Sequence, residues 1–135
     1  MLAHKLTGEP LVQIIGRGTG LDDKGLQNKQ RLLEVAARRT TDKLSAELAL
    51  QEYGGFEVAT MVGAMLGAAA SGRLVIVDGY IATAATLVAV QLRPEMRDYC
   101  IFVHDSAETG HLLTRRVFEK KLGGIPVIVW VPPNK

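Results

Sequence analysis

Apolar residues recur along the chain either at the spacing of a helix or in short unbroken runs. Between Lys24 and Arg39, Leu26, Leu33 and Ala36 return at helical intervals, and lysines and arginines occupy other faces. Asp22 lies just before this stretch and is one of the residue types that cap the start of a helix. The pattern therefore predicts a helix from Lys24 to Arg39.

One predicted helix, from Phe56 to Ser71, is apolar on nearly all of its sides and contains many small residues. A helix of this kind is buried between layers of a larger fold, so we expect close packing around its glycines Gly63 and Gly67. The remaining helices are predicted over Lys43–Glu52, Ile81–Leu92 and Glu108–Leu122, with a short helical turn opening at Pro94.

Short aliphatic runs separate these helices. Leu74–Val77 and Tyr99–Val103 are typical of strands buried on both faces of a parallel sheet. Val127–Val131 has the same character, and Leu11–Ile15 predicts a further short strand or extended segment. Strands that alternate with helices indicate parallel pairing. We therefore predict an α/β fold, a three-layer parallel sheet flanked by helices, as an incomplete portion of a larger Rossmann-like domain.

Composition and charge narrow the class of protein. The chain has 135 residues, enough for one domain or a piece of one, and its 16 basic and 14 acidic residues are too balanced to predict a nucleic-acid partner. The longest nearly uncharged stretch, Val58–Ala70, is shorter than the roughly 20 residues of a membrane span, so we predict no membrane partner. The single cysteine, Cys100, excludes a disulfide framework and is expected to be a small buried hydrophobic residue. We expect a cytoplasmic protein without a signal peptide.

Polar residues follow two of the predicted strands, at the ends where α/β proteins bind ligands. Asp78 follows Leu74–Val77, and Ser106 follows Tyr99–Val103. The carboxyl ends of neighbouring parallel strands open onto a shared crevice, which makes both side chains candidates for ligand binding. By position alone, a second interpretation is equally open, in which each side chain only caps the following helix.

A glycine-rich loop precedes the first long helix. Gly16, Gly18 and Gly20 can present successive backbone N–H groups to a phosphate, and the helix start adds positive potential. Lys29, two turns inside the helix, is the natural cation for such a site. The spacing matches neither a dinucleotide fingerprint nor a Walker loop, so a simple tight turn is the alternative.

Two other constellations lie between residues 104 and 111. The side chains of metal-ligating type there are His104, Asp105, Glu108 and His111. Their spacing matches no standard metal site. A nucleophilic triad of Ser106 with His111 would need a strained Gly-x-Ser-x-Gly turn, which the sequence lacks. We therefore predict neither a metal site nor a triad.

Four strings, in this order and spacing, are similar to those of one enzyme family. They are GRGTGLDD at 16–23, GGFE at 54–57, VDGYIATAA at 77–85 and HDSAETGH at 104–111. Over residues 1 to about 127 the chain resembles the nicotinate-nucleotide–dimethylbenzimidazole phosphoribosyltransferases. The resemblance implies an enzyme of cobalamin biosynthesis that joins nicotinate mononucleotide to 5,6-dimethylbenzimidazole, releasing nicotinate and forming α-ribazole 5′-phosphate. It also implies a homodimer that needs no metal or organic cofactor.

The resemblance also assigns nucleotide-binding residues. Gly18, Lys29, Asp78 and Ser106 fall where the family contacts the ribose and phosphate of the nucleotide. Asp78 is then expected to bind ribose hydroxyls and to stabilise an oxocarbenium-like transition state, and Ser106 to donate a hydrogen bond to the phosphate. These roles agree with the separate interpretation of the glycine loop and the strand ends.

The chain departs from the family at both ends. Members of the family are more than twice as long, and a base-binding part with a Gly-Ile-Gly-Asn-Thr-Thr motif would precede Met1. Beyond Pro126 the family continues into a Gly-Glu-Gly segment whose glutamate is the general base, whereas this chain continues as VIVWVPPNK. We therefore expect residues 1–127 to be the C-terminal part of a phosphoribosyltransferase large domain and residues 128–135 to be an aberrant tail, as a frameshift near residue 128 would produce.

These departures leave no residue of the chain assigned to catalysis, and we expect little or no activity from the chain by itself. Three alternatives to the transferase stay open at this point. The first is a non-catalytic nucleotide-binding fragment or one subunit of a split enzyme. The second is an unrelated nucleotide-binding α/β module, and the third is a product without a stable fold.

Overall fold

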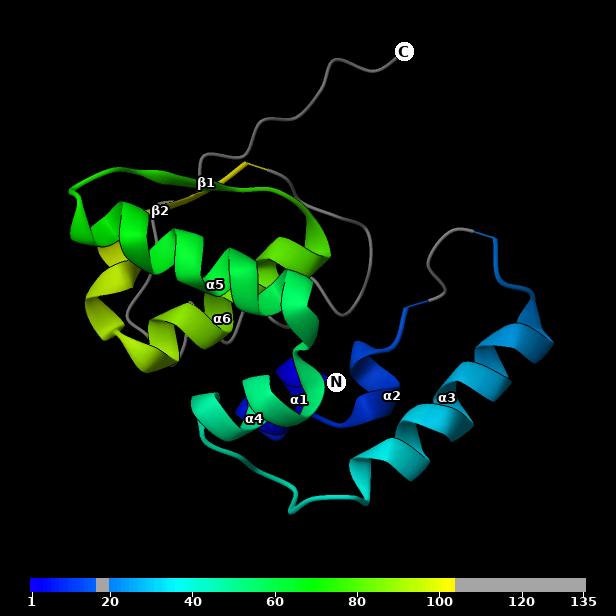
Figure 1. Cartoon of the computed structure of the whole chain (residues 1–135). Coiled ribbons are helices and arrows are strands. Elements are labelled where there is room, and N and C mark those ends of the chain that lie inside the picture. The colour runs from blue at the N-terminus through cyan, green and yellow to red at the C-terminus, as the bar shows by residue number, and fades with distance from the viewer. Residues whose placement is uncertain (17–19, 104–135) are drawn as a thin grey trace, which may run out of the picture.

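The computed structural model describes residues 1–16 and 20–103, and helices make up most of this part of the chain (Figure 1). The helices are α1 (Leu2–Thr7), α2 (Leu11–Ile14), α3 (Asp23–Ala37), α4 (Ala46–Tyr53), α5 (Gly55–Ala70), α6 (Gly79–Leu92) and the 3₁₀ helix η1 (Pro94–Tyr99). The strands are β1 (Val75–Val77) and β2 (Cys100–Phe102). The helix predicted at 108–122 and the strand predicted at 127–131 lie outside the described residues.

The two strands pair in parallel, as the alternation of strands and helices predicts. The register pairs Val75 with Cys100, Ile76 with Ile101 and Val77 with Phe102. Between the strands, α6 and η1 carry the chain back to the starting edge of the sheet, which is the connection that parallel strands require. The described residues therefore form part of an α/β domain.

The helix predicted from Lys24 to Arg39 is confirmed as α3. The carboxylate of Asp22 accepts a 2.8 Å hydrogen bond from the N–H of Gly25 and so caps the helix start. The next helix begins later than the predicted Lys43, at Ala46, because the Ser45 hydroxyl provides its cap.

Residues Leu11–Ile14 form the helix α2 and Ile15 alone is extended, so the prediction of a strand or extended segment over Leu11–Ile15 is wrong. The N–H of Ile15 donates a 2.9 Å hydrogen bond to the carbonyl of Leu11, which closes the single turn of α2. Ile14 is buried and Val12 is exposed, as one turn of helix on a surface requires. The prediction failed because so few residues cannot distinguish a helical period from an extended one.

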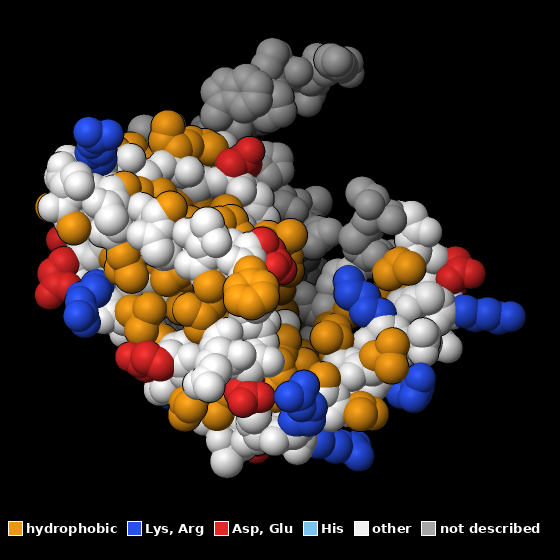
Figure 2. Space-filling view, viewed as in Figure 1, with side chains coloured by type: hydrophobic (Ala, Val, Ile, Leu, Met, Phe, Trp, Pro, Cys, Tyr) orange, Lys and Arg blue, Asp and Glu red, His pale blue; other side chains and the backbone are white. Residues whose placement is uncertain are grey.

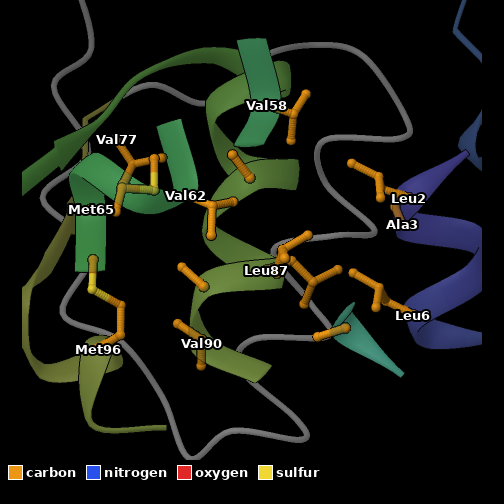
Figure 3. Close-up of a cluster of buried hydrophobic side chains, with 14 of the residues drawn as sticks. Leu2, Ala3, Leu6, Val58, Val62, Met65, Val77, Leu87, Val90 and Met96 are labelled. Carbon is orange, nitrogen blue, oxygen red and sulfur yellow. The ribbon is translucent and has the colours of Figure 1, made fainter. Parts of the chain in front are cut away.

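The core lies between α6 and the helices around it (Figure 3). Leu87, Val88 and Val90 of α6 are at most 1% exposed. Figure 3 shows side chains of α5 on one side of α6, with Leu2 and Leu6 of α1 approaching from another. Burial of aliphatic surface is the main favourable term in folding, so α6 is the element around which the others are fixed.

The prediction that the Phe56–Ser71 helix is buried between layers is wrong, because one face of α5 is exposed. Three residues of α5 are buried: Val58, Val62 and Met65. Phe56 is 93% exposed, and a Cβ built on Gly63 or Gly67 would meet no atom of the protein within 4 Å. Figure 2 shows hydrophobic side chains gathered over the middle of the molecule, where α5 lies. Within the described residues, no helix combines the length and apolar character that crossing a membrane needs.

The strand β1 is also covered on one face rather than on both, contrary to the prediction. Val77 is 1% exposed, whereas Ile76, which points to the opposite face, is 69% exposed. An unbroken aliphatic run has no polar position to show which of its faces the chain covers, and this is why the sequence did not reveal the difference.

Candidate functional site

Asp78 lies at the carboxyl end of β1, in the single position between the strand and α6. Gly79 follows with a φ of +79°, a left-handed conformation that glycine adopts without strain, and this turns the chain directly into the helix. The Asp78 side chain is exposed and makes no capping hydrogen bond to α6. The capping interpretation therefore does not describe Asp78, and its carboxylate oxygens are available to a ligand.

The start of α6 beside Asp78 adds positive potential to the same place. The side chain of Asp78 does not occupy the start of α6, and a helix start attracts anions and electron-rich oxygens.

Thr83 of α6 stabilises the turn at Gly79 and is a residue that the sequence analysis did not identify. Its side chain is completely buried, and its hydroxyl donates a 2.8 Å hydrogen bond to the carbonyl of Gly79. The signal in the sequence is a threonine placed four residues after a glycine in an otherwise apolar helix, where its hydroxyl must find a partner on the preceding turn.

Lys29 projects from α3 toward the glycine-rich loop. Its ammonium donates a 2.8 Å hydrogen bond to the carbonyl of Gly16, the first glycine of that loop. Burial lowers the pKa of the Met1 amino group, and the nearby charge of Lys29 lowers it further. Within the described residues no carboxylate forms an ion pair with Lys29, so its charge is available to an anion.

The structure places Asp78 and Lys29 within the described residues, and Gly18 and Ser106 lie outside them. Figure 2 shows lysine and arginine side chains along α3. Among the described residues, no hydrogen bond or ion pair links Asp78 to Lys29.

The described residues hold no group of three or more His, Cys, Asp or Glu side chains that could bind a metal ion. His104, Asp105, Glu108 and His111 lie outside the described residues. Cys100 is 1% exposed, and its thiol donates a hydrogen bond to the carbonyl of Met96, so its prediction as a buried hydrophobic residue is confirmed.

Two grooves are found in the described part of the chain, away from Asp78 and Lys29. One of about 480 Å³ lies between α5 and η1, and another of about 510 Å³ lies between α4 and α5. Neither groove is lined by a residue that the sequence predicts to bind a ligand.

A family model and individual relatives both relate this chain to phosphoribosyltransferases. Residues 1–123 match the family model described as Phosphoribosyltransferase. The nicotinate-nucleotide–dimethylbenzimidazole phosphoribosyltransferase of Dechloromonas aromatica is 52% identical over 114 residues, which cover 82% of this chain and 33% of the relative. The enzyme of the same name from Cupriavidus necator is 47% identical over 127 residues, which cover 94% of this chain and 36% of the relative.

The fold is also similar to that of a solved structure, the crystal structure of CobT from Thermus thermophilus. The TM-score is 0.82 at 29% sequence identity, and the match covers 96% of this chain and 37% of that one. The chain therefore spans about a third of the length of the relatives that it matches.

Proposed function

This chain belongs to the nicotinate-nucleotide–dimethylbenzimidazole phosphoribosyltransferase family, and on that premise we propose that it forms the part of such an enzyme that binds the ribose and phosphate of the nucleotide. The observation that carries the proposal is the exposed carboxylate of Asp78, which lies at the carboxyl end of a parallel strand and does not cap α6. In α/β folds this edge is where nucleotides bind, and a carboxylate there accepts hydrogen bonds from ribose hydroxyls.

The phosphate has its own set of partners in this proposal. Lys29 supplies the positive charge, Gly18 contributes a backbone N–H, and the Ser106 hydroxyl donates a hydrogen bond. The 2.8 Å hydrogen bond from Lys29 to Gly16 supports this arrangement, because it holds the ammonium at the mouth of the glycine loop. A cation beside backbone N–H groups is a recurrent way of holding a phosphate.

The reaction proposed for the whole enzyme takes place at C1′ of the ribose. The bond from C1′ to the nicotinate nitrogen breaks, and a bond from C1′ to a nitrogen of 5,6-dimethylbenzimidazole forms on the opposite face. Positive charge develops on the ribose as the first bond lengthens, and the Asp78 carboxylate stabilises it. The benzimidazole proton passes to a general base, and no residue of this chain is assigned that role.

The organisation of the whole protein is part of the same proposal. Residues 1–127 belong to the large domain and residues 128–135 form a tail outside the family pattern. The enzyme acts as a homodimer in the cytoplasm on nicotinate mononucleotide and 5,6-dimethylbenzimidazole, without a metal or organic cofactor.

Titration calorimetry with nicotinate mononucleotide tests the proposal. Asp78→Asn keeps the size of the side chain and removes its charge, so we expect affinity to fall about tenfold or more, as for other hydrogen bonds to charged groups. Asp98→Asn is the matched control, because Asp98 is an exposed carboxylate on η1 that pairs with Arg97. We expect its affinity to stay within about twofold of the wild type.

The outcomes separate the candidate functions. A wild-type chain that binds no nicotinate mononucleotide would contradict the proposal, and equal affinities of wild type and Asp78→Asn would contradict the role of Asp78. Adding 5,6-dimethylbenzimidazole and following α-ribazole 5′-phosphate by chromatography then distinguishes a transferase from a nucleotide-binding fragment. Product would indicate that the chain holds a base of its own.

A further inference from the structure

Lys5 is completely buried, which is rare for a lysine. Its ammonium donates hydrogen bonds to three backbone carbonyls, at 2.7 Å to Ala37, 2.8 Å to Thr41 and 3.4 Å to Thr40. Ala37 is the last residue of α3, and the C-terminal end of a helix carries partial negative charge. The charge of Lys5 is therefore held by a helix end rather than by a carboxylate.

Tyr53 of α4 binds the same helix end. Its hydroxyl donates a 3.0 Å hydrogen bond to the carbonyl of Ala36 and lies 2.8 Å from the hydroxyl of Thr40. The Lys5 ammonium lies 5.9 Å from the centre of the Tyr53 ring, within the range of a cation–π contact. We call Lys5, Tyr53 and Thr40 the α3 clamp.

Apolar packing contributes little to the position of α3, so the position of this helix depends more on its polar contacts, including the α3 clamp. No residue of α3 is buried: Leu26, Leu33 and Ala36 are half-buried, and Leu32 and Val35 are 52% and 56% exposed. A helix on a globular protein is ordinarily held by an apolar stripe against the core. In Figure 1, α3 stands to one side of the other helices. Polar contacts hold both parts of the helix: the α3 clamp and the exposed ion pair of Arg39 with Glu52 at one end, and the hydrogen bond from Lys29 to Gly16 nearer the other.

We infer that Lys5 is a positioning residue for the phosphate site, because its buried ammonium fixes the end of α3 and thereby the place of Lys29. The inference rests on the proposed function of Lys29. Lys29 lies eight residues before Ala37, a distance of about 12 Å along a helix, so a shift of the clamped end is carried along α3 to the ammonium. Misplacement of a binding group by about 1 Å is enough to weaken ligand contacts severely.

The variant Lys5→Met tests this inference, because methionine keeps a long apolar stem and removes the ammonium. The carbonyls of Ala37 and Thr41 then lose their donor, and α3 is released at that end. Tyr53→Phe removes only the hydroxyl of the same clamp and keeps the ring, so it serves if Lys5→Met does not fold. Lys5→Arg keeps the positive charge and should therefore keep part of the wild-type affinity. Thr86→Val is the control, since it removes a buried hydroxyl from α6, away from α3.

Two measurements on the folded chains decide the question. Hydrogen exchange followed by mass spectrometry should show at least about fivefold faster exchange of α3 amides near Lys29 in Lys5→Met and Tyr53→Phe than in the wild type or Thr86→Val. Titration calorimetry should show affinity for nicotinate mononucleotide about tenfold weaker in Lys5→Met, with partial recovery in Lys5→Arg.

Each outcome either supports or overturns the inference. Unchanged exchange in α3, or faster exchange with unchanged affinity, would overturn it, because Lys5 would then be a purely structural residue. An equal loss of affinity in Thr86→Val would also overturn it by showing a general effect of destabilisation. Failure of the wild-type chain to bind nicotinate mononucleotide would overturn the proposed function instead. The titration of the wild-type chain alone shows this failure, without any variant.

Discussion

The ammonium of Lys29 donates a 2.8 Å hydrogen bond to the carbonyl of Gly16, and this contact joins the middle of α3 to the start of the glycine-rich loop. In sequence the two residues are 13 positions apart, and the Asp22 cap and nearly two turns of α3 lie between them. The contact explains how a lysine well inside a helix can serve a site that the loop builds.

The first prediction concerns the part of the ligand that Lys29 contacts. Lys29→Met should weaken binding of nicotinate mononucleotide about tenfold, because one charged contact to the phosphate is lost. Binding of nicotinate riboside, which has no phosphate, should be unchanged. Lys24→Met removes another lysine from the same helix and is the control. Calorimetric titration of both ligands checks this, and equal losses for the two ligands would show that Lys29 acts on the fold rather than on the phosphate.

Sequence reasoning succeeded where local chemistry decides the structure. Asp22 and the recurring apolar residues located α3, and the alternation of aliphatic runs with helices gave the parallel pairing of β1 and β2. Asp78 was placed at the strand end because an aspartate after an aliphatic run has few other positions in an α/β fold.

The failures have one physical cause, which is that burial depends on parts of the fold distant in sequence. Phe56 and Ile76 belong to segments that are apolar throughout, and no local pattern states which faces this chain covers. The buried Lys5 was missed for a related reason. A lysine in a short N-terminal helix gives no signal that its partners are carbonyls more than thirty residues away.

The second prediction tests the turn between β1 and α6. Gly79→Ala should lower the free energy of unfolding by about 1 kcal/mol or more, because φ is +79° at this residue and a Cβ disfavours that conformation. Gly63→Ala should instead raise it by up to about 1 kcal/mol, because Gly63 is inside α5, where alanine favours the helix and its Cβ meets open space. Urea unfolding followed by circular dichroism measures both. A stabilising Gly79→Ala would contradict the left-handed turn.

The third prediction tests which apolar side chains form the core. Leu87→Ala should lower the free energy of unfolding by about 2–5 kcal/mol, because Leu87 is completely buried and its removal leaves a cavity. Phe56→Gln should change it by no more than about 0.5 kcal/mol, since the phenylalanine is 93% exposed. The same urea measurement compares the two variants. A large loss in Phe56→Gln would mean that this face of α5 is covered in solution.

The last prediction uses the pH dependence of stability. Burial raises the pKa of the Cys100 thiol from an ordinary value of 9.0 to about 11. The folded state therefore holds its proton more tightly than the unfolded state, so the contribution of Cys100 to stability is complete below pH 9 and is lost as the pH rises toward 11. Lysines and tyrosines titrate in the same range, so the comparison is with Cys100→Ala. The free energy of unfolding should fall more steeply between pH 9 and 11 in the wild type than in Cys100→Ala.

The thiol of the folded wild type should also react slowly with a disulfide reagent at about pH 8, and rapidly once urea unfolds the chain. Parallel pH profiles, or fast reaction of the folded chain, would show that Cys100 is accessible and that β2 is not buried against the core.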